Sequence, residues 1–174
     1  SAVTIDALQS LQPDHVIVAT GAKREAPDIP GKNLHHVFDG EEMRGLLLGG
    51  DDRGLKKLHP IKRALVALSQ AVGLTRNISW VRMLSHLWMP LQKNIVIVGG
   101  GLVGIEIAEF LIERRRHVTV LEPSATLSPE LSIVRRARVI HLLREHGCDM
   151  LTHAQVSHID QQGVHYSREG VEHC

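Results

Sequence analysis

Runs of apolar residues mark two short segments in the second half of the chain. Residues 95–98 are four consecutive β-branched apolar residues, which predicts a strand buried on both faces. Residues 118–121 predict a second buried strand. Between them, apolar positions at helical spacing predict a helix with a broad apolar face: Ile105, Ala108, Phe110, Leu111 and Ile112. The order strand, helix, strand predicts a parallel pair joined by a helical crossover.

The pattern continues towards the C-terminal end. A long helix is predicted over about residues 130–146, ending at Gly147, with these buried positions: Ile133, Val139, Leu142 and Leu143. Residues 150–151 predict a third strand of the parallel sheet. Residues 156–159 and 164–166 flank the turn sequence Asp-Gln-Gln-Gly and predict an antiparallel hairpin. The predicted fold class is α/β, a Rossmann-like parallel sheet in the order β-α-β-α-β, followed by a hairpin and preceded by a helical insertion.

The sequence of residues 1–38 divides into an approach segment, a strand and a connection. Residues 1–12 predict a short approach segment. Residues 14–20 predict a buried strand, closed by Gly21. Residues 22–33 carry two prolines and a glycine and predict an extended surface connection.

Residues 39–92 predict a helical connection or insertion between residues 1–38 and a C-terminal domain of residues 93–174. The expected helices cover about residues 39–48, 60–72 and 78–88, with a loop at residues 51–54. The first helix begins at Asp39 and ends at Gly49-Gly50. The second begins at Pro60, and its apolar stripe is Ile61, Leu65, Leu68 and Val72. The third ends before Pro90. Two interpretations stay open: an insertion that covers a core, or a partner-docking or cofactor-covering element that uses Trp80 and Trp88.

The composition excludes several classes of protein. The 174 residues are 43% hydrophobic and 22% charged with a net charge of +1, which gives no basic field for nucleic acid or an anionic membrane. No apolar run reaches the roughly 18 residues of a membrane span. The N-terminus has neither a basic region nor an apolar signal core, and a cytoplasmic location is the default expectation.

The cysteines and histidines predict no metal site. Cys148 and Cys174 are too few and too far apart for a C-x-x-C pair or an iron–sulfur cluster. We expect Cys148 to pack as a small apolar residue. The 12 histidines give no i, i+4 helical pair, so surface and half-buried imidazoles are the expected reading. No nucleophile and base suited to hydrolysis stand out, and no catalytic residue is predicted.

Candidate binding chemistry follows the first strand of the second half, where Gly99, Gly101 and Gly104 have the spacing G-x-G-x-x-G. The first glycine permits the tight turn, the second permits close approach of a pyrophosphate, and the third permits close helix packing. The helix N-terminus offers N–H groups to phosphates. The predicted dinucleotide site therefore comprises Gly99, Gly100, Gly101, Leu102, Val103 and Gly104. The alternative is a glycine turn required only for packing.

Glu122 stands at the end of the second strand, 18 residues after Gly104, and Pro123 follows it. A carboxylate at this point accepts hydrogen bonds from ribose hydroxyls and repels a 2′-phosphate. No arginine or lysine follows until Arg135. The sequence therefore predicts NAD(H) in preference to NADP(H). The alternative is a solvated acid at a strand end.

A second motif, Ala19-Thr20-Gly21, follows the strand predicted at residues 14–20, and Glu106 extends the fingerprint to G-x-G-x-x-G-x-E. Together they resemble the two-dinucleotide-binding-domain flavoproteins. Within these, the chain is most similar to the C-terminal part of the 2,4-dienoyl-CoA reductase, 2-enoate reductase and trimethylamine dehydrogenase group. That likeness rests on the sequences Leu-Trp-Met-Pro-Leu-Gln-Lys-Asn (87–94), Gly-Gly-Gly-Leu-Val-Gly (99–104) and Leu-Arg-Glu-His-Gly (143–147). It covers about residues 14–38 and 90–167.

The resemblance implies roles for these residues. Residues 1–38 correspond to a strand of the FAD domain and its crossover, with Ala19, Thr20 and Gly21 bordering the FAD. Glu106 would lie near the nicotinamide, and it could equally be a first-turn acid that stabilises the helix N-terminus. Arg116 departs from the pattern, because relatives place glycine there. A positive φ at that arginine would cost roughly 1 kcal/mol unless the turn is rebuilt.

The family's FAD fingerprint, FMN barrel and cluster-binding cysteines are absent from these residues, so we expect a fragment that does not hold flavin tightly alone. The resemblance implies FAD in the full-length protein, with FMN and a 4Fe-4S cluster in further parts of the polypeptide. Three function classes stay open: the NADH-binding portion of a flavin-dependent reductase of activated double bonds, part of an NADH:ferredoxin or disulfide-type reductase, and a non-catalytic ADP-binding module. Homo-oligomer formation is also left open.

Overall fold

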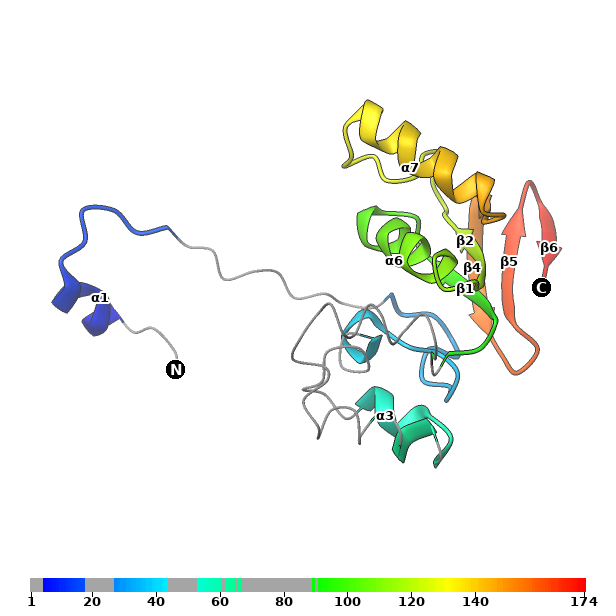
Figure 1. Cartoon of the computed structure of the whole chain (residues 1–174), viewed down its shortest axis with the longest axis horizontal. Coiled ribbons are helices and arrows are strands. Elements are labelled where there is room, and N and C mark those ends of the chain that lie inside the picture. The colour runs from blue at the N-terminus through cyan, green and yellow to red at the C-terminus, as the bar shows by residue number, and fades with distance from the viewer. Residues whose placement is uncertain are drawn as a thin grey trace.

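The structure is a computed structural model, and it describes residues 5–17, 27–43, 53–60, 62–64, 66, 89 and 91–174. Among these described residues, most of the regular structure lies from residue 94 onwards (Figure 1). Strands β1 (Asn94–Val98), β2 (His117–Leu121) and β3 (Asp149–Leu151) form a parallel sheet in the order β1-β2-β3. Helices α6 (Leu102–Ile112) and α7 (Ile133–Glu145) connect them. The predicted Rossmann-like β-α-β-α-β order is confirmed.

The main core lies between the parallel sheet and its two helices. Its most buried side chains come from every layer: Ile105, Ala108 and Leu111 of α6, Val118 and Val120 of β2, and Leu143 of α7. Cys148 packs in the same cluster at 6% exposure, as predicted, and burial raises the pKa of its thiol to about 11. Because a thiol of that pKa stays protonated at neutral pH, Cys148 acts here as a small apolar residue.

Two burial predictions are wrong. Val96 in β1 is 44% exposed, although an unbroken apolar run predicted burial on both faces. Side chains of a strand alternate between the two faces of the sheet, and Ile95 and Ile97 pack against the core, so Val96 lies on the opposite face, which the core does not cover. Ile133 is 73% exposed, because the structure begins α7 at that residue and only Val139, Ile140, Leu142 and Leu143 reach the core.

A second, antiparallel sheet follows the first. Strands β4 (Ala154–Ile159) and β5 (Val164–Arg168) form the predicted hairpin, with a register shift at Ser157 between Val156 and His158. A third strand, β6 (Val171–His173), pairs with β5 and was not predicted. Its short connection depends on two consecutive residues with positive φ, Glu169 at 53° and Gly170 at 79°. Ala154 N donates to Glu122 O at 3.0 Å, so this sheet begins beside the carboxyl end of β2.

The predicted strand at residues 14–20 is wrong in its described part. Residues 15–17 form no strand, and Val16 and Ile17 are 53% and 91% exposed. A strand needs neighbouring strands for its backbone hydrogen bonds, and the described sheets are built entirely from residues 94–173. Residues 18–21 lie outside the described residues. Helix α1 (Ile5–Leu11) occupies the segment predicted only as an approach, and it lies apart from the sheets in Figure 1.

The helix predicted after Asp39 begins as expected. Residues 40–43 are helical, and a capping box closes the first turn: Glu42 N donates to Asp39 Oδ1 at 2.7 Å, and Asp39 N donates to Glu42 Oε2 at 3.0 Å. Lys57 Nζ also bonds Glu42 Oε2 at 2.7 Å. The rest of this helix, through Gly49-Gly50, lies outside the described residues.

The loop predicted at residues 51–54 is wrong in its described part, because α3 (Arg53–Lys57) is helical there. The helix predicted from Pro60 is present at residues 60, 62–64 and 66, and Arg63 N donates to His59 O at 2.9 Å. Val66 is buried against Leu55 in a small satellite core. The predicted stripe Ile61, Leu65, Leu68 and Val72 lies outside the described residues, as does the helix at 78–88 with its two tryptophans. No helix in the described part of the chain is long and apolar enough to cross a membrane.

The turn after α6 is rebuilt around Arg116. Arg115, one residue earlier, takes the positive φ of 56°. Arg116 N donates to Leu111 O at 3.1 Å and Arg115 N donates to Ile112 O at 2.9 Å, which is the Schellman pattern of a helix end. The strain expected at Arg116 therefore falls on Arg115, in the position where helices prefer glycine.

Arg115→Gly is expected to raise the free energy of unfolding by about 0.5–1 kcal/mol. Glycine removes the strain of the left-handed conformation, and its larger loss of backbone entropy on folding cancels part of that gain. Arg115 is exposed, so the change removes little packing. Denaturant unfolding of the chain measures it, with Arg116→Gly as the control that keeps the strained residue. An equal gain from both variants would contradict the assignment.

Candidate functional site

The fingerprint glycines form the turn between β1 and α6. Gly99 has a φ of 105°, and its N–H donates to Leu121 O at 2.8 Å, so the turn is tied to the end of β2. A Cβ on Gly104 would overlap the Gly99 carbonyl oxygen. The first and third glycines are therefore needed to bring helix and turn together, whatever ligand binds.

Gly101 differs from these two, because a Cβ there would meet only Glu130 Oε1, at 3.5 Å. It is the N-cap of α6 and contributes no side-chain hydrogen bond to the helix end. The first N–H groups of a helix have no intrahelical acceptor. The backbone N–H groups of Leu102 and Val103 belong to this first turn, the part of a helix that suits an anion.

Glu122 lies against this turn. Its Oε2 accepts the Gly100 N–H at 2.7 Å and its Oε1 accepts the Ser124 N–H at 2.9 Å. Burial would raise the pKa of this carboxyl, but hydrogen bonds from Ser124 and Gly100 outweigh it and hold the pKa below its usual value. The residue is half-buried and anchored at both carboxylate oxygens.

Ser128 was not identified from the sequence, although it supports the same turn. It is fully buried, and both its N–H (2.8 Å) and its Oγ (3.2 Å) bond the Gly100 carbonyl oxygen. Leu127 packs so closely that a Cβ on Gly100 would overlap it. Gly100 is therefore held by Glu122 at its N–H and by Ser128 at its carbonyl. Nothing in the local pattern of this serine-containing loop distinguishes Ser128 from Ser124 or Ser132.

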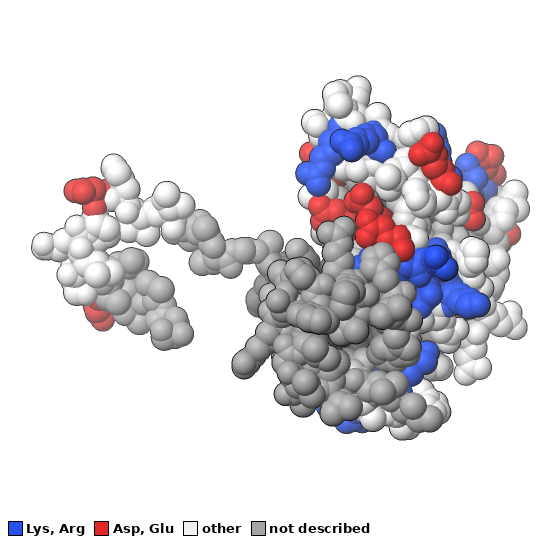
Figure 2. Space-filling model, viewed as in Figure 1, with Lys and Arg blue, Asp and Glu red and all other residues white. Residues whose placement is uncertain are grey.

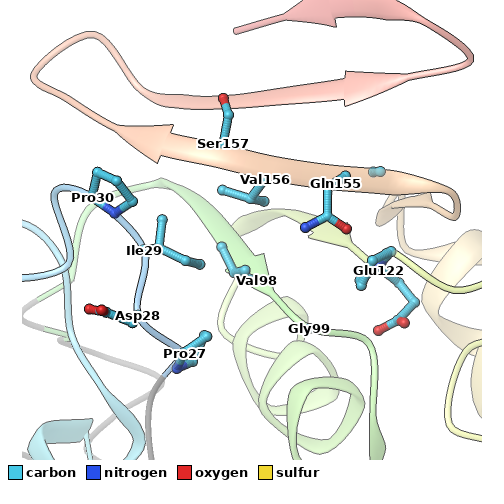
Figure 3. Close-up of a pocket in the computed structure, with 12 residues that line it drawn as sticks. Pro27, Asp28, Ile29, Pro30, Val98, Gly99, Glu122, Gln155, Val156 and Ser157 are labelled. Atoms are coloured by element: carbon cyan, nitrogen blue, oxygen red, sulfur yellow. The ribbon is translucent and has the colours of Figure 1, made fainter.

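A cavity of about 380 Å³ opens beside Gly99 and Glu122, within the 300–1,000 Å³ typical of ligand pockets (Figure 3). It lies at the carboxyl ends of β1 and β2, where doubly wound sheets bind ligands. Pro123 and Val156 contribute apolar lining, and residues 27–30 close one side. That segment is fixed to the second sheet, because Ile159 N donates to Pro30 O at 2.8 Å.

The structure does not bring Glu106 into this group. Its side chain is 54% exposed, and its Oε1 lies 3.7 Å from Arg135 Nη2. This ion pair joins α6 to α7, in a region where Figure 2 shows acidic and basic side chains close together. An exposed pair of this kind stabilises by about 0–1 kcal/mol. Glu106 is the fifth residue of α6, so the alternative of a first-turn acid is wrong. Ala19, Thr20 and Gly21 lie outside the described residues.

The sequence of residues 2–173 matches the family model described as pyridine nucleotide-disulphide oxidoreductase. The chain belongs to this family. Its members are flavin-dependent oxidoreductases that use FAD and NAD(P)H, which confirms the predicted enzyme class and nucleotide-binding fold. The 2,4-dienoyl-CoA reductase group, to which the sequence was likened, is a finer assignment that the family match does not make.

Individual relatives cover several activities of this family. Dihydrolipoyl dehydrogenase of Acholeplasma laidlawii is 26% identical over 164 residues, 94% of this chain and 38% of the relative. Bilirubin reductase of Mediterraneibacter gnavus is 28% identical over 152 residues, 87% of this chain and 17% of the relative. A solved 2-naphthoyl-CoA reductase shares the fold with a TM-score of 0.60 at 20% identity, over 98% of this chain and 20% of that one. The chain thus spans well under half the length of these proteins.

Proposed function

We propose that the chain is the NADH-binding portion of a flavin-dependent reductase that passes hydride from NADH to FAD. The observation that supports this most directly is the position of Glu122, bonded to the fingerprint turn at Gly100 and bordering a cavity of about 380 Å³. A carboxylate at the end of the second strand of a Rossmann unit is placed for the adenine ribose. FAD belongs to the full-length protein in this proposal.

The residues of the turn would bind the nucleotide as follows. The N–H groups of Leu102 and Val103, at the N-terminus of α6, would hold the pyrophosphate, with Gly101 leaving room for its approach. Glu122 would accept a ribose hydroxyl. Two carboxylate oxygens offer about four acceptor sites, so Glu122 is able to keep both backbone bonds while accepting a third. Pro123 and Val156 would pack on the adenine.

The preference for NADH over NADPH follows from charge. The lowered pKa keeps Glu122 ionised at neutral pH, and an anion beside the ribose repels a 2′-phosphate. Glu122 is also anchored at both oxygens, so it does not swing away cheaply to admit that phosphate.

The remaining roles are proposed from the resemblance. Glu106 would lie on the nicotinamide side, Ala19, Thr20 and Gly21 would border the FAD, and residues 1–38, 39–92 and 93–174 would be three separate regions of the protein. When bound, NADH supplies the hydride. The part of this chain is to orient the nucleotide and set the charge around it.

For the substrate class we propose an activated double bond, reduced in parts of the protein that carry FMN and a 4Fe-4S cluster. The sequence motifs at 87–94, 99–104 and 143–147 support it, as does the match to a bilirubin reductase over 87% of this chain. A ferredoxin or disulfide-type reductase is the second candidate. It is favoured by putidaredoxin reductase CamA of Pseudomonas putida, which is 33% identical over 104 residues, 54% of this chain and 24% of the relative.

Stopped-flow mixing of the full-length flavoprotein with NADH tests the proposal. We expect NADH to bleach the flavin absorbance, and we expect NADPH to need a much higher concentration to reach the same rate. The reason is that only NADPH places a 2′-phosphate beside Glu122. Tighter use of NADPH would contradict the cofactor preference. Binding of NADH without any flavin bleaching would identify a non-catalytic module and overturn the proposed hydride transfer.

A further inference from the structure

A cluster of three potential metal ligands lies at the tip of the β4–β5 hairpin: His158, Asp160 and His165. His158 and His165 are directly opposite each other in the strand register. Their rings are stacked with centroids 4.1 Å apart and planes within 4° of parallel. One ligand atom from each of the three side chains lies within 4.8 Å of the other two.

Asp160 is already oriented by the turn that it opens. Its Oδ1 accepts N–H groups from Gln162 at 2.7 Å and Gly163 at 3.0 Å. Its Oδ2 is left to face His165 Nε2 at 3.0 Å. The turn therefore orients one carboxylate oxygen, Oδ2, towards the cluster.

His158 is oriented by Ser157, the residue at the register shift of the hairpin. Ser157 Oγ donates its one hydrogen to the His165 carbonyl oxygen at 3.1 Å. It must then act as acceptor towards His158 Nδ1, 3.2 Å away, so that Nδ1 carries the proton. In this tautomer Nε2 of His158 holds a free lone pair, as a metal ligand requires.

We infer that His158, Asp160 and His165 form a binding site for a divalent transition-metal ion, with Zn²⁺ as the representative. Two imidazole nitrogens and one carboxylate oxygen are a donor set that Zn²⁺, Co²⁺, Ni²⁺ and Cu²⁺ accept, with water in the open positions. Linear spacing hid this set from the sequence, because the β-turn and the strand register bring the ligands together.

The distances require a small closure on binding. Ligands of a tetrahedral zinc site stand about 3.4 Å apart, given metal–ligand distances near 2.1 Å. Asp160 Oδ2 and His165 Nε2 are already 3.0 Å apart. His158 therefore makes most of the movement, turning its ring out of the stack and giving up its contact with Ser157 Oγ. It is the exposed member of the three, so this rotation disturbs no core packing. His165 must also transfer its proton to Nδ1, since Nε2 now faces a carboxylate.

The surroundings hold the cluster in place. His36 Nε2 lies 3.0 Å from the Asp160 carbonyl oxygen, and Ile159 N donates to Pro30 O at 2.8 Å. The turn is thus fixed to the segment at residues 27–37 before any ion binds. An ion shared by β4 and β5 would join the two strands next to their connecting turn, and it would stabilise the folded state by an amount that grows with the ion concentration relative to its Kd.

Titration of the tag-free full chain with Zn²⁺ by calorimetry, and with Co²⁺ by visible absorption, tests the site. We expect one ion per chain, Co²⁺ bands of low-coordinate nitrogen and oxygen ligation, and a melting temperature that rises with Zn²⁺. His158→Ala should weaken binding by about tenfold or more, by analogy with the loss of supporting ligands in known sites. Because His158 is exposed, the variant should melt at the wild-type temperature without metal.

His141→Ala is the matched control. His141 is also an exposed histidine beside a carboxylate, 3.3 Å from Glu145 on α7, and should leave the affinity unchanged. Asp160→Asn, which keeps an acceptor for the Gln162 and Gly163 N–H groups, should weaken binding as His158→Ala does. Absence of saturable binding would overturn the site. So would equal losses in the His141 and His158 variants, which would identify unspecific histidine binding.

Discussion

Gly104→Ala is expected to abolish nucleotide binding and to destabilise the fold by about 3 kcal/mol or more, the upper range for overpacking in a close-packed interior. The added methyl group would overlap the backbone carbonyl oxygen of Gly99, and its next neighbour is the side chain of Ile97. Backbone does not yield as a flexible side chain does, so α6 must shift away from the turn. Thermal unfolding and calorimetric titration with NADH measure the two effects.

Two other glycines separate the causes. Gly101→Ala has room for its methyl group, with only Glu130 Oε1 at 3.5 Å, and should keep wild-type stability while losing NADH affinity, because the methyl group occupies the approach of the pyrophosphate. Gly40→Ala, in open space at the start of a helix, should change neither binding nor fold adversely. If Gly101→Ala bound NADH as tightly as the wild type, the turn would serve packing alone.

Glu122→Gln is expected to weaken NADH binding by roughly tenfold or more while NADPH binding changes little or improves. Hydrogen bonds to a charged group contribute about 1.5–3 kcal/mol, and each 1.4 kcal/mol is a factor of ten in affinity. The amide also places a donor against the Gly100 or Ser124 N–H, so one of these two bonds is lost. Titrations with NADH and NADPH measure the ratio of the two affinities.

Glu130→Gln is the control for Glu122→Gln. Glu130 is a second, exposed carboxylate near the fingerprint, with its Oε1 beside Gly101. Both nucleotides carry the same pyrophosphate, so removing this charge should change their affinities by equal factors. An unchanged NADPH to NADH ratio in Glu122→Gln would remove the proposed basis of the cofactor preference.

The parallel β-α-β-α-β order was predictable because its signals are local. The apolar run at residues 95–98, the helical spacing from Ile105 to Ile112 and the glycines between them each act within a few residues of the chain. The same holds for the Asp39 cap, where the capping partner Glu42 is three residues away. Patterns of this kind state which faces are apolar and where a helix begins.

Burial was less predictable, because it depends on what covers an element. The run at 95–98 suits a strand covered on both faces, yet Val96 is 44% exposed, because it lies on the face opposite to Ile95 and Ile97, which pack against the core. Val16 and Ile17 are apolar and exposed, since no described strand pairs with them. The strained residue after α6 also moved by one position, from Arg116 to Arg115, when the turn adopted its hydrogen bonds.

The sequence by itself determined the nucleotide-binding unit and its candidate residues, Gly99 to Gly104 and Glu122, because turn chemistry and periodicity are properties of neighbouring residues. Only the tertiary structure decided that Glu122 is anchored to Gly100, that Ser128 holds the same residue from 28 positions away, and that Asp160 and two histidines meet at a hairpin. These contacts join residues distant in the chain or opposed across strands, and strand register and packing set them.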